Sequence, residues 1–194
     1  TDPPYGIGYS SNSFGGKKGY GHRYDQSKTW DDEAPDLTAI IGLGVPAMIW
    51  GGNYFPVPPS RGWLSWRKPD AMPTFSDMEL CWTNLSIPAK TFSYSMRAVG
   101  YERLDAGFGH PTQKPVALME WCLGFLPDAK TILDPFMGSG TTLVACQRKG
   151  RHGTGIELDP DYFEIACRRV DEAARQPDLL IPETRPAPVQ ESLI

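Results

Sequence analysis

The sequence predicts an α/β protein with a doubly wound, mostly parallel sheet. In its C-terminal half, apolar stretches of strand length alternate with longer stretches of helical periodicity, and short loops join them. Strands at residues 131–134 and 153–157 are each followed directly by a helix, an order typical of parallel sheets. A glycine-rich turn, Gly138-Ser139-Gly140, follows the first of these strands.

The N-terminal half predicts a long loop followed by shorter elements. Residues 6–30 are rich in Gly, Ser, Tyr and Lys without a hydrophobic period, which indicates a functional loop or disorder. A short helix is expected at 36–43 and a buried strand at 46–50. Further strands rich in aromatic residues are expected at 62–66 and 79–83, and an edge strand at 90–99, before a connection at 100–109.

The C-terminal half has clearer boundary signals. Pro115 suits the first turn of a helix at 114–126, and Gly150 ends a helix at 141–149. Asp159 can cap a last helix that has Pro160 in its first turn and Arg175 near its end. Residues 176–194 are a Pro-rich tail, so the sequence predicts a single domain over residues 1–175.

Composition limits the function. The net charge of −4 excludes a generally basic nucleic-acid coat, so any DNA binding needs a local basic surface. Its candidates are Lys17, Lys18, His22, Arg23, Arg61, Arg67, Lys68, Arg97 and Arg103. Cys81, Cys122, Cys146 and Cys167 form no metal-binding spacing; we expect the last three to be small buried residues of helices in a reducing compartment. With neither a membrane-spanning run nor a signal peptide, we expect a cytoplasmic protein without metal.

The glycine-rich turn has the layout of a nucleotide-type cofactor loop. Gly138 and Gly140 let a ligand lie against the backbone, and the loop opens a helix whose N–H groups can bind polar atoms. Glu157 ends the next strand and can accept both ribose hydroxyls. Because no Lys follows Gly140 and no third glycine stands at the usual place, a compact adenosyl cofactor fits better than a triphosphate or a dinucleotide.

The chain begins with Thr1-Asp2-Pro3-Pro4-Tyr5, a segment that can hold a flat base bearing an amino group. This segment and the loop Asp134-Pro135-Phe136-Met137-Gly138-Ser139-Gly140-Thr141-Thr142 resemble the amino-methylating DNA methyltransferases in the permuted arrangement called the beta class, of phage or restriction-modification type. The segments at 110–115, 155–163, 50–55 and 75–80 extend the resemblance, in family order. It implies a Rossmann-like methyltransferase fold with a catalytic half (1–60), a short target-recognition region (61–109) and a cofactor-binding half (110–175).

The resemblance implies S-adenosylmethionine as cofactor and double-stranded DNA as substrate. Asp2 and the Pro3 carbonyl would each accept one N–H of an exocyclic amine, Asp2 would act as general base, Pro4 would help to fix the loop, and Tyr5 would stack on a flipped base. The residues implied for the cofactor are Thr112, Gln113, Lys114, Asp134, Pro135, Phe136, Gly138, Gly140, Thr141, Glu157, Leu158 and Asp159. An Asp at position 2 favours adenine N6. Members of the resembled family often pair, so the resemblance makes a homodimer possible and leaves the oligomeric state open.

Three alternatives remain open. The target could be cytosine N4, or the substrate could be a protein glutamine or an RNA, although enzymes of that kind usually place the cofactor loop first. The chain could also be a non-catalytic DNA-binding module. In a parallel sheet, a buried strand normally leads into a loop such as the one at Asp2. Only Thr1 precedes Asp2 in the sequence given, so we expect that strand not to be part of it.

Overall fold

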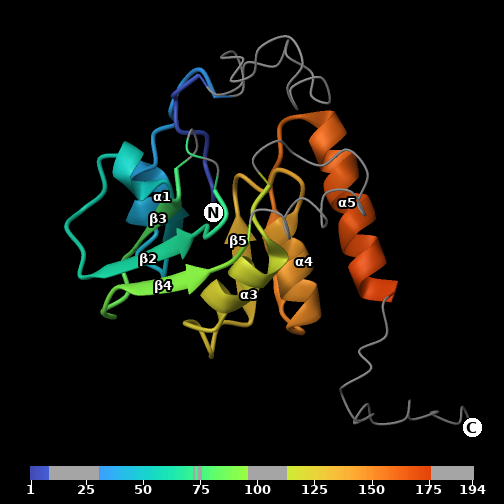
Figure 1. Ribbon diagram of the computed structural model, residues 1–194. Helices are drawn as coiled ribbons and strands as arrows, with labels where there is room; N and C mark the ends of the chain where they lie inside the picture. Colours follow the sequence, from blue (N-terminus) through green and yellow to red (C-terminus); the bar gives the residue numbers. More distant parts are fainter. Residues whose placement is uncertain (9–30, 72, 74–75, 96–112, 176–194) are drawn as a thin grey trace, which may run out of the picture.

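The computed structural model describes residues 1–8, 31–71, 73, 76–95 and 113–175. It confirms the α/β class, and every helix and strand expected within these ranges is present (Figure 1). In chain order the described elements are α1 (Thr38–Gly42), β1 (Met48–Trp50), the 3-10 turn η2 (Gly52–Tyr54), β2 (Gly62–Arg67), β3 (Met78–Thr83), β4 (Lys90–Ser93), α3 (Val116–Leu123), β5 (Thr131–Asp134), α4 (Thr141–Arg148), β6 (His152–Gly155) and α5 (Pro160–Arg175).

The described strands form two sheets. One has the order β1-β3-β2-β4, and β4 lies at its edge as expected. In it β3 runs antiparallel to both β1 and β2, whereas β2 and β4 are parallel. The second sheet pairs β5 with β6 in parallel. The antiparallel pairing of β2 with β3 follows from the short link between them, since parallel neighbours require a longer crossover.

Thr1 connects the two sheets. Its backbone pairs with β1, because its amino group donates to the Met48 carbonyl at 2.8 Å and its carbonyl accepts from Trp50 N–H at 3.0 Å. Its hydroxyl donates to Asp134 Oδ1 at 2.7 Å, at the end of β5. The N-terminus accordingly lies between the first sheet and β5 in Figure 1.

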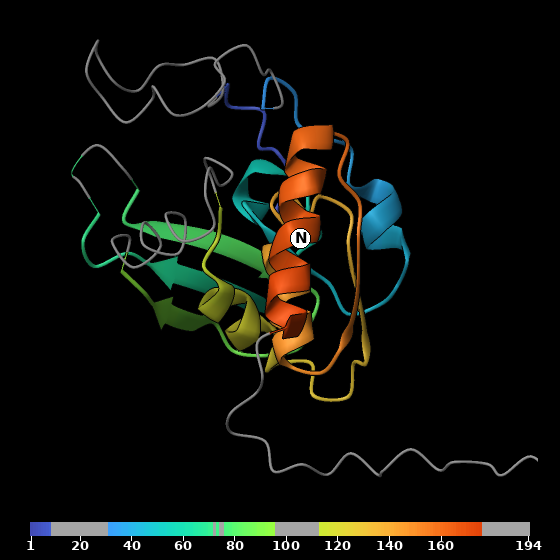
Figure 2. The same cartoon turned by 90° about the vertical axis from the view of Figure 1, so that its right-hand side faces the viewer.

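Apolar side chains cover both faces of the first sheet. On one face, residues of α3 and α4 pack with Trp50, Leu64 and Trp66. On the other face, α1 packs over Ile49 and Trp82. The helices α3, α4 and α5 lie in succession, and α5 is outermost on its side (Figure 2). Trp50, Trp66 and Trp82 are buried and Trp63 is partly buried, so these aromatic residues belong to the core of the sheet.

The cysteines follow the same packing, with one exception. Cys81, Cys122 and Cys146 are buried, and burial raises the pKa of Cys122 to about 12 and that of Cys146 to about 11, so both thiols stay protonated. The prediction that Cys167 is buried is wrong, because it lies on the exposed face of α5 next to the buried Ala166. Among the described residues, no helix is both long and apolar enough to cross a membrane.

Candidate functional site

Two sequence motifs from opposite ends of the chain meet at one place. The Asp2–Tyr5 segment continues from Thr1, and the hydrogen bond from Thr1 Oγ1 to Asp134 Oδ1 joins it to the start of the glycine loop, 133 positions away. Since β1 and β5 flank Thr1, both motifs project from the same region between the sheets. The fold therefore brings together the two segments that the sequence singles out.

The backbone of the N-terminal segment is fixed by a buried carboxylate. Asp31 Oδ1 accepts hydrogen bonds from the N–H of Tyr5 at 2.6 Å and of Gly6 at 3.1 Å, and the Asp31 carbonyl accepts from Gly8 N–H. Asp31 is only 2% exposed, and Pro3 is buried as well. Hydrogen bonds from backbone N–H groups to a carboxylate are among the stronger ones in proteins, so this segment is preorganised.

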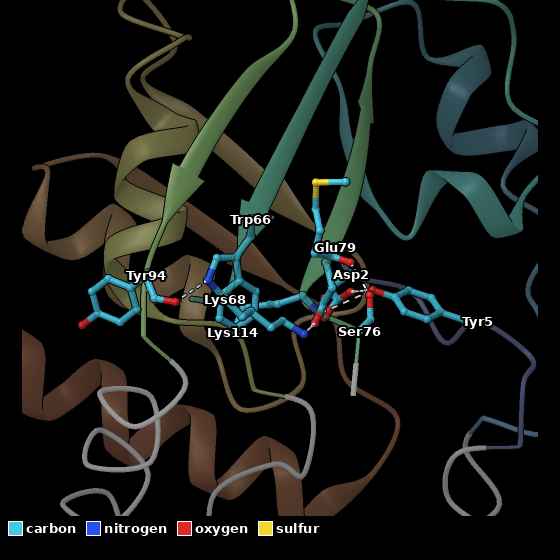
Figure 3. Close-up of polar contacts among 9 residues, drawn as sticks. Asp2, Tyr5, Trp66, Lys68, Ser76, Glu79, Tyr94 and Lys114 are labelled. Carbon is cyan, nitrogen blue, oxygen red and sulfur yellow. Dashed lines mark hydrogen bonds and ion pairs between the residues drawn. The ribbon is translucent and has the colours of Figure 1, made fainter. Parts of the chain in front are cut away.

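The Asp2 side chain lies in a cluster of polar groups (Figure 3). Its Oδ1 accepts the Tyr5 hydroxyl at 2.8 Å, and its Oδ2 accepts Lys114 Nζ at 2.6 Å. Lys114 Nζ also lies 3.4 Å from the Tyr5 hydroxyl. An ionised carboxylate has about four lone-pair positions. Asp2 can therefore accept further hydrogen bonds while keeping both of these partners.

Two more charged side chains extend the cluster. Glu79 of β3 places Oε2 3.0 Å from Lys114 Nζ, and its Oε1 pairs with the ammonium of Lys68, just after β2. The Lys68 ammonium also lies over the Trp66 ring, 4.7 Å from its centroid. The charges of Asp2, Lys114, Glu79 and Lys68 cancel. A balanced set of this kind limits the cost of burying each charge.

The pKa shifts follow from this arrangement. Burial raises the pKa of Asp2, and the Glu79 charge adds to this, while the Lys114 ammonium opposes it. Burial would also raise the pKa of Glu79, but attraction from Lys114 and Lys68 outweighs it and lowers that pKa to about 2. The two acids hold the pKa of Lys114 well above its usual value despite burial. Glu79 and Lys114 are thus charged at neutral pH, and Asp2 is the more basic of the two carboxylates.

The Tyr5 ring is held by the turn after β1. It stacks on Tyr54 with centroids 4.8 Å apart, and Phe55 meets its edge. Gly51 has a φ of +69°, and a Cβ at that position would lie 2.1 Å from the Tyr5 ring. Only glycine combines this backbone conformation with so close an approach. The expected stacking of a base on Tyr5 stays a prediction.

The glycine loop passes from β5 to α4 by two left-handed glycines. Gly138 has a φ of 51° and Gly140 a φ of 78°. Gly140 is the N-cap of α4, and a Cβ on it would lie 2.9 Å from the Ala166 Cβ of α5. Asp134 Oδ1 accepts the Phe136 N–H at 3.2 Å and so closes the start of the loop. The loop is therefore a tight turn in which Gly138 is partly exposed and Gly140 is buried.

Glu157 closes the loop from the β6 side. Its Oε2 accepts the Gly138 N–H at 2.9 Å, and its Oε1 accepts the Asp159 N–H at 2.8 Å. Asp159 in turn caps α5, since its Oδ1 accepts the N–H of Asp161 and Tyr162, which confirms the predicted cap. Beside these carboxylates the Leu158 side chain is 94% exposed. The site thus combines acceptors with an exposed apolar side chain.

Arg169 of α5 holds the other end of the loop. Its guanidinium donates to the Ser139 carbonyl at 2.5 Å, to Ser139 Oγ at 2.9 Å and to Thr141 Oγ1 at 3.2 Å. Ser139 Oγ also donates to Gln113 Oε1 at 3.1 Å, just before α3. Through these contacts the loop is tied to the helices on both sides of it.

Replacing Arg169 with methionine should destabilise the protein. The change removes charged hydrogen bonds from a buried carbonyl and two hydroxyls, and we expect a loss of roughly 1–3 kcal/mol in the free energy of unfolding. Arg168→Met is the matched control, because Arg168 is the exposed neighbour on the same helix. Denaturant titration of both variants checks this. Equal losses in the two would contradict a clamp at Arg169.

The structure places the remaining expected residues as follows. Lys114, expected at the cofactor, directs its ammonium to Asp2 and Glu79. Lys68, expected on a basic surface, is buried against Glu79, so that expectation is wrong. Arg61 and Arg67 are exposed but stand at opposite ends of β2, so they do not form one patch. Lys17, Lys18, His22, Arg23, Arg97, Arg103 and Thr112 lie outside the described residues.

Sequence reasoning missed four contributors to the site: Asp31, Glu79, Ser139 and Arg169. Glu79 begins a predicted strand and lies in a segment of family resemblance, but neither feature assigns it a role. Arg169 lies on an amphipathic helix, where an arginine is ordinarily exposed. Both reach the site through contacts 30 or more positions away along the chain. No local pattern reports such contacts.

Comparisons with known proteins agree on one family. A family model described as DNA methylase, of the N6 and N4 type, matches residues 65–168. The chain is 44% identical over 63 residues to the type II methyltransferase M.HpaI of Haemophilus parainfluenzae, covering 32% of this chain and 20% of that protein. It is 46% identical over 63 residues to M2.DpnII of Streptococcus pneumoniae, covering 32% of this chain and 24% of that protein. The chain thus spans about a fifth to a quarter of the length of these relatives.

Two solved structures are similar to part of this chain. M1.HpyAVI in complex with SAM is 28% identical, with a TM-score of 0.42, over 56% of this chain and 61% of that chain. The cytosine-N4-specific PvuII DNA methyltransferase is 19% identical, with a TM-score of 0.44, over 56% of this chain and 50% of that chain.

Proposed function

Because this chain belongs to the DNA methylase family, whose model covers more than half of it, we propose that it transfers a methyl group from S-adenosylmethionine to an exocyclic amine of a DNA base. The observation that carries this proposal is the hydrogen bond between Thr1 and Asp134. This hydrogen bond holds Asp2, whose carboxylate can bind an amine, beside the glycine loop after Asp134, which can bind an adenosyl cofactor. Transfer requires these two sites to be neighbours.

Asp2 and the Pro3 carbonyl are the proposed acceptors of the two amine N–H groups. An exocyclic amine is a poor nucleophile because its lone pair is delocalised into the ring. Two acceptors in tetrahedral positions draw the nitrogen towards sp³ geometry and localise the lone pair on it. In the transfer, the N–C bond would form as the S–C bond of the sulfonium breaks and its electron pair stays on sulfur as a neutral thioether. One N–H proton would pass to Asp2, whose raised pKa makes it a stronger base than an ordinary aspartate.

The cofactor loop and β6 are the proposed cofactor site. S-adenosylmethionine, when bound, supplies an electrophilic methyl group on a sulfonium. Asp134, Pro135, Phe136, Gly138, Gly140 and Thr141 would line its amino-acid end, with Gln113 and Lys114 nearby. Glu157 would accept the ribose hydroxyls, and the exposed Leu158 would border the adenine together with Asp159. The two left-handed glycines and the exposed apolar residue beside Glu157 fit such a ligand.

Double-stranded DNA is the proposed partner, and the target base would have to be flipped out of the helix. An acid at position 2 favours adenine N6 over cytosine N4. Arg61 and Arg67 are exposed and could contact phosphates. The four cysteines are free thiols, which fits a cytoplasmic enzyme. Association into a homodimer stays a prediction.

The test is transfer of a labelled methyl group from S-adenosylmethionine to unmethylated bacterial DNA, followed by digestion and nucleoside mass spectrometry. We expect N6-methyl-2′-deoxyadenosine as the labelled product. N4-methyl-2′-deoxycytidine would keep the mechanism and overturn the choice of base. Label on RNA or protein but not on DNA would overturn the substrate class, and binding of DNA without transfer to any of the three would indicate a non-catalytic module.

A further inference from the structure

The proposed transfer assigns no role to Glu79 or Lys68. Both are nevertheless connected to Asp2, because Glu79 forms ion pairs with Lys68 and with Lys114, which contacts Asp2. Lys114 Nζ lies between two carboxylates, 2.6 Å from Asp2 Oδ2 and 3.0 Å from Glu79 Oε2. The Lys114 side chain is 6% exposed and that of Lys68 8%. Figure 3 shows the side chains of Asp2, Glu79 and Lys114 converging from three separate parts of the chain.

A buried lysine paired with Asp2 alone would compete with the substrate. A full ion pair concentrates the ammonium on one carboxylate, and this weakens that carboxylate as a hydrogen-bond acceptor and as a base. Glu79 relieves this competition because its Oε2 forms an ion pair with the same ammonium at 3.0 Å. Lys68 in turn keeps Glu79 ionised, because it pairs with the other oxygen of Glu79.

We propose that Glu79 is a positioning residue for Asp2, which shares the Lys114 ammonium with it and so leaves the Asp2 carboxylate able to accept the substrate amine and its departing proton. The inference rests on the proposed methyl transfer for its catalytic meaning. The electrostatic coupling of Glu79 to Asp2 is a separate claim that needs no substrate. The charged and titratable groups that interact with Asp2 in the described structure are Tyr5, Lys114, Glu79 and the buried thiol of Cys81.

The experiment compares the wild-type chain with three variants. In Glu79→Gln, Lys114 is left to Asp2, so the pKa of Asp2 should fall by about 0.5 or more. In Lys68→Met, Glu79 loses one of its two cations and pairs more strongly with Lys114. Lys114 then stabilises the ionised form of Asp2 less, so the pKa of Asp2 should rise. The double variant Lys68→Met/Glu79→Gln removes one charge of each sign, which keeps the buried cluster neutral. It should fold even if Glu79→Gln does not, and the pKa of Asp2 should again fall.

The first readout is a titration of the Asp2 carboxyl carbon by NMR without ligands. The second is the single-turnover rate of methyl transfer across pH. At neutral pH we expect the rate of Glu79→Gln and of the double variant to fall about tenfold with the KM of both substrates changed less than threefold. The acid limb of the pH profile should move with the pKa of Asp2.

The outcomes separate this inference from the proposed function. An Asp2 titration that does not move in any variant overturns the role of Glu79, even if the wild-type chain methylates DNA. If the double variant has the wild-type rate and the wild-type Asp2 titration, Glu79 has only a packing role, and the proposed positioning role is overturned. A shifted titration in a wild-type chain without transfer supports the coupling and counts against the proposed function alone.

Discussion

Replacing Asp2 with alanine is expected to reduce the single-turnover rate of methyl transfer by roughly a thousandfold, within the range of a lost general base. The variant loses one of the two acceptors for the amine as well as the base. Lys114 keeps Glu79 as a partner at 3.0 Å, so no buried ammonium is left alone and the fold should persist. Binding of S-adenosylmethionine should change by less than about threefold, because Asp2 is not among the proposed cofactor residues.

The rate is measured with enzyme in excess over duplex DNA, and cofactor binding is measured by calorimetry. Asp2→Asn adds a test of charge, since it keeps the shape and an acceptor for the Tyr5 hydroxyl but cannot take a proton. Asp32→Ala is the matched control, because Asp32 is an exposed aspartate beside the buried Asp31. A wild-type rate in Asp2→Ala would remove Asp2 from the mechanism.

Replacing Lys114 with methionine should have the largest effect on stability. The change leaves Asp2 with the Tyr5 hydroxyl and Glu79 with Lys68, and it removes the buried ammonium that links these two partly buried acids. Removing one partner of a buried ion pair typically costs about 3–5 kcal/mol. We expect a loss of that order in the free energy of unfolding at pH 7, and the acids should recover part of it by binding protons.

The loss of stability in Lys114→Met should become smaller as the pH falls. In the wild type the pKa of Glu79 is lowered to about 2, so its contribution to stability is present above the unfolded value near 4.5 and disappears as the pH falls towards 2. Lys114 supplies much of that contribution. The difference between wild type and Lys114→Met should therefore narrow as the pH falls through this window.

Denaturant titrations between pH 2 and pH 8 measure this difference. Lys130→Met is the control, since Lys130 is exposed and lies just before β5. A constant difference between wild type and Lys114→Met across the window would show that the ion pairs of Lys114 are not the cause of the lost stability.

The local elements of this fold could be predicted from the sequence because their signals are local. The strands at β5 and β6 and the helices α4 and α5 follow from apolar periodicity, from Gly150 after α4 and from the cap at Asp159. The glycine loop was predictable for the same reason. Two left-handed glycines directly after a strand indicate a tight turn wherever the rest of the chain lies.

Pairing between distant segments could not be predicted in this way. The pairing of β1 with β3 rather than with β2 joins segments that are far apart along the chain, so no local signal reports it. The exposure of Cys167 depends on which face of α5 is covered, and the apolar neighbours in the sequence suggested the opposite. Burial on a helix is decided by the elements packed against it.

The sequence by itself determined the family, the two motifs and the residue types able to hold an amine and an adenosyl cofactor. The tertiary structure decided which charges meet. Lys114 is one of the residues implied for the cofactor, but its ammonium reaches Asp2, 112 positions away, and Glu79 of β3. Burial then couples these groups, because charges removed from water are stabilised by their nearest partners. The strength of Asp2 as a base is thus a property of the folded cluster.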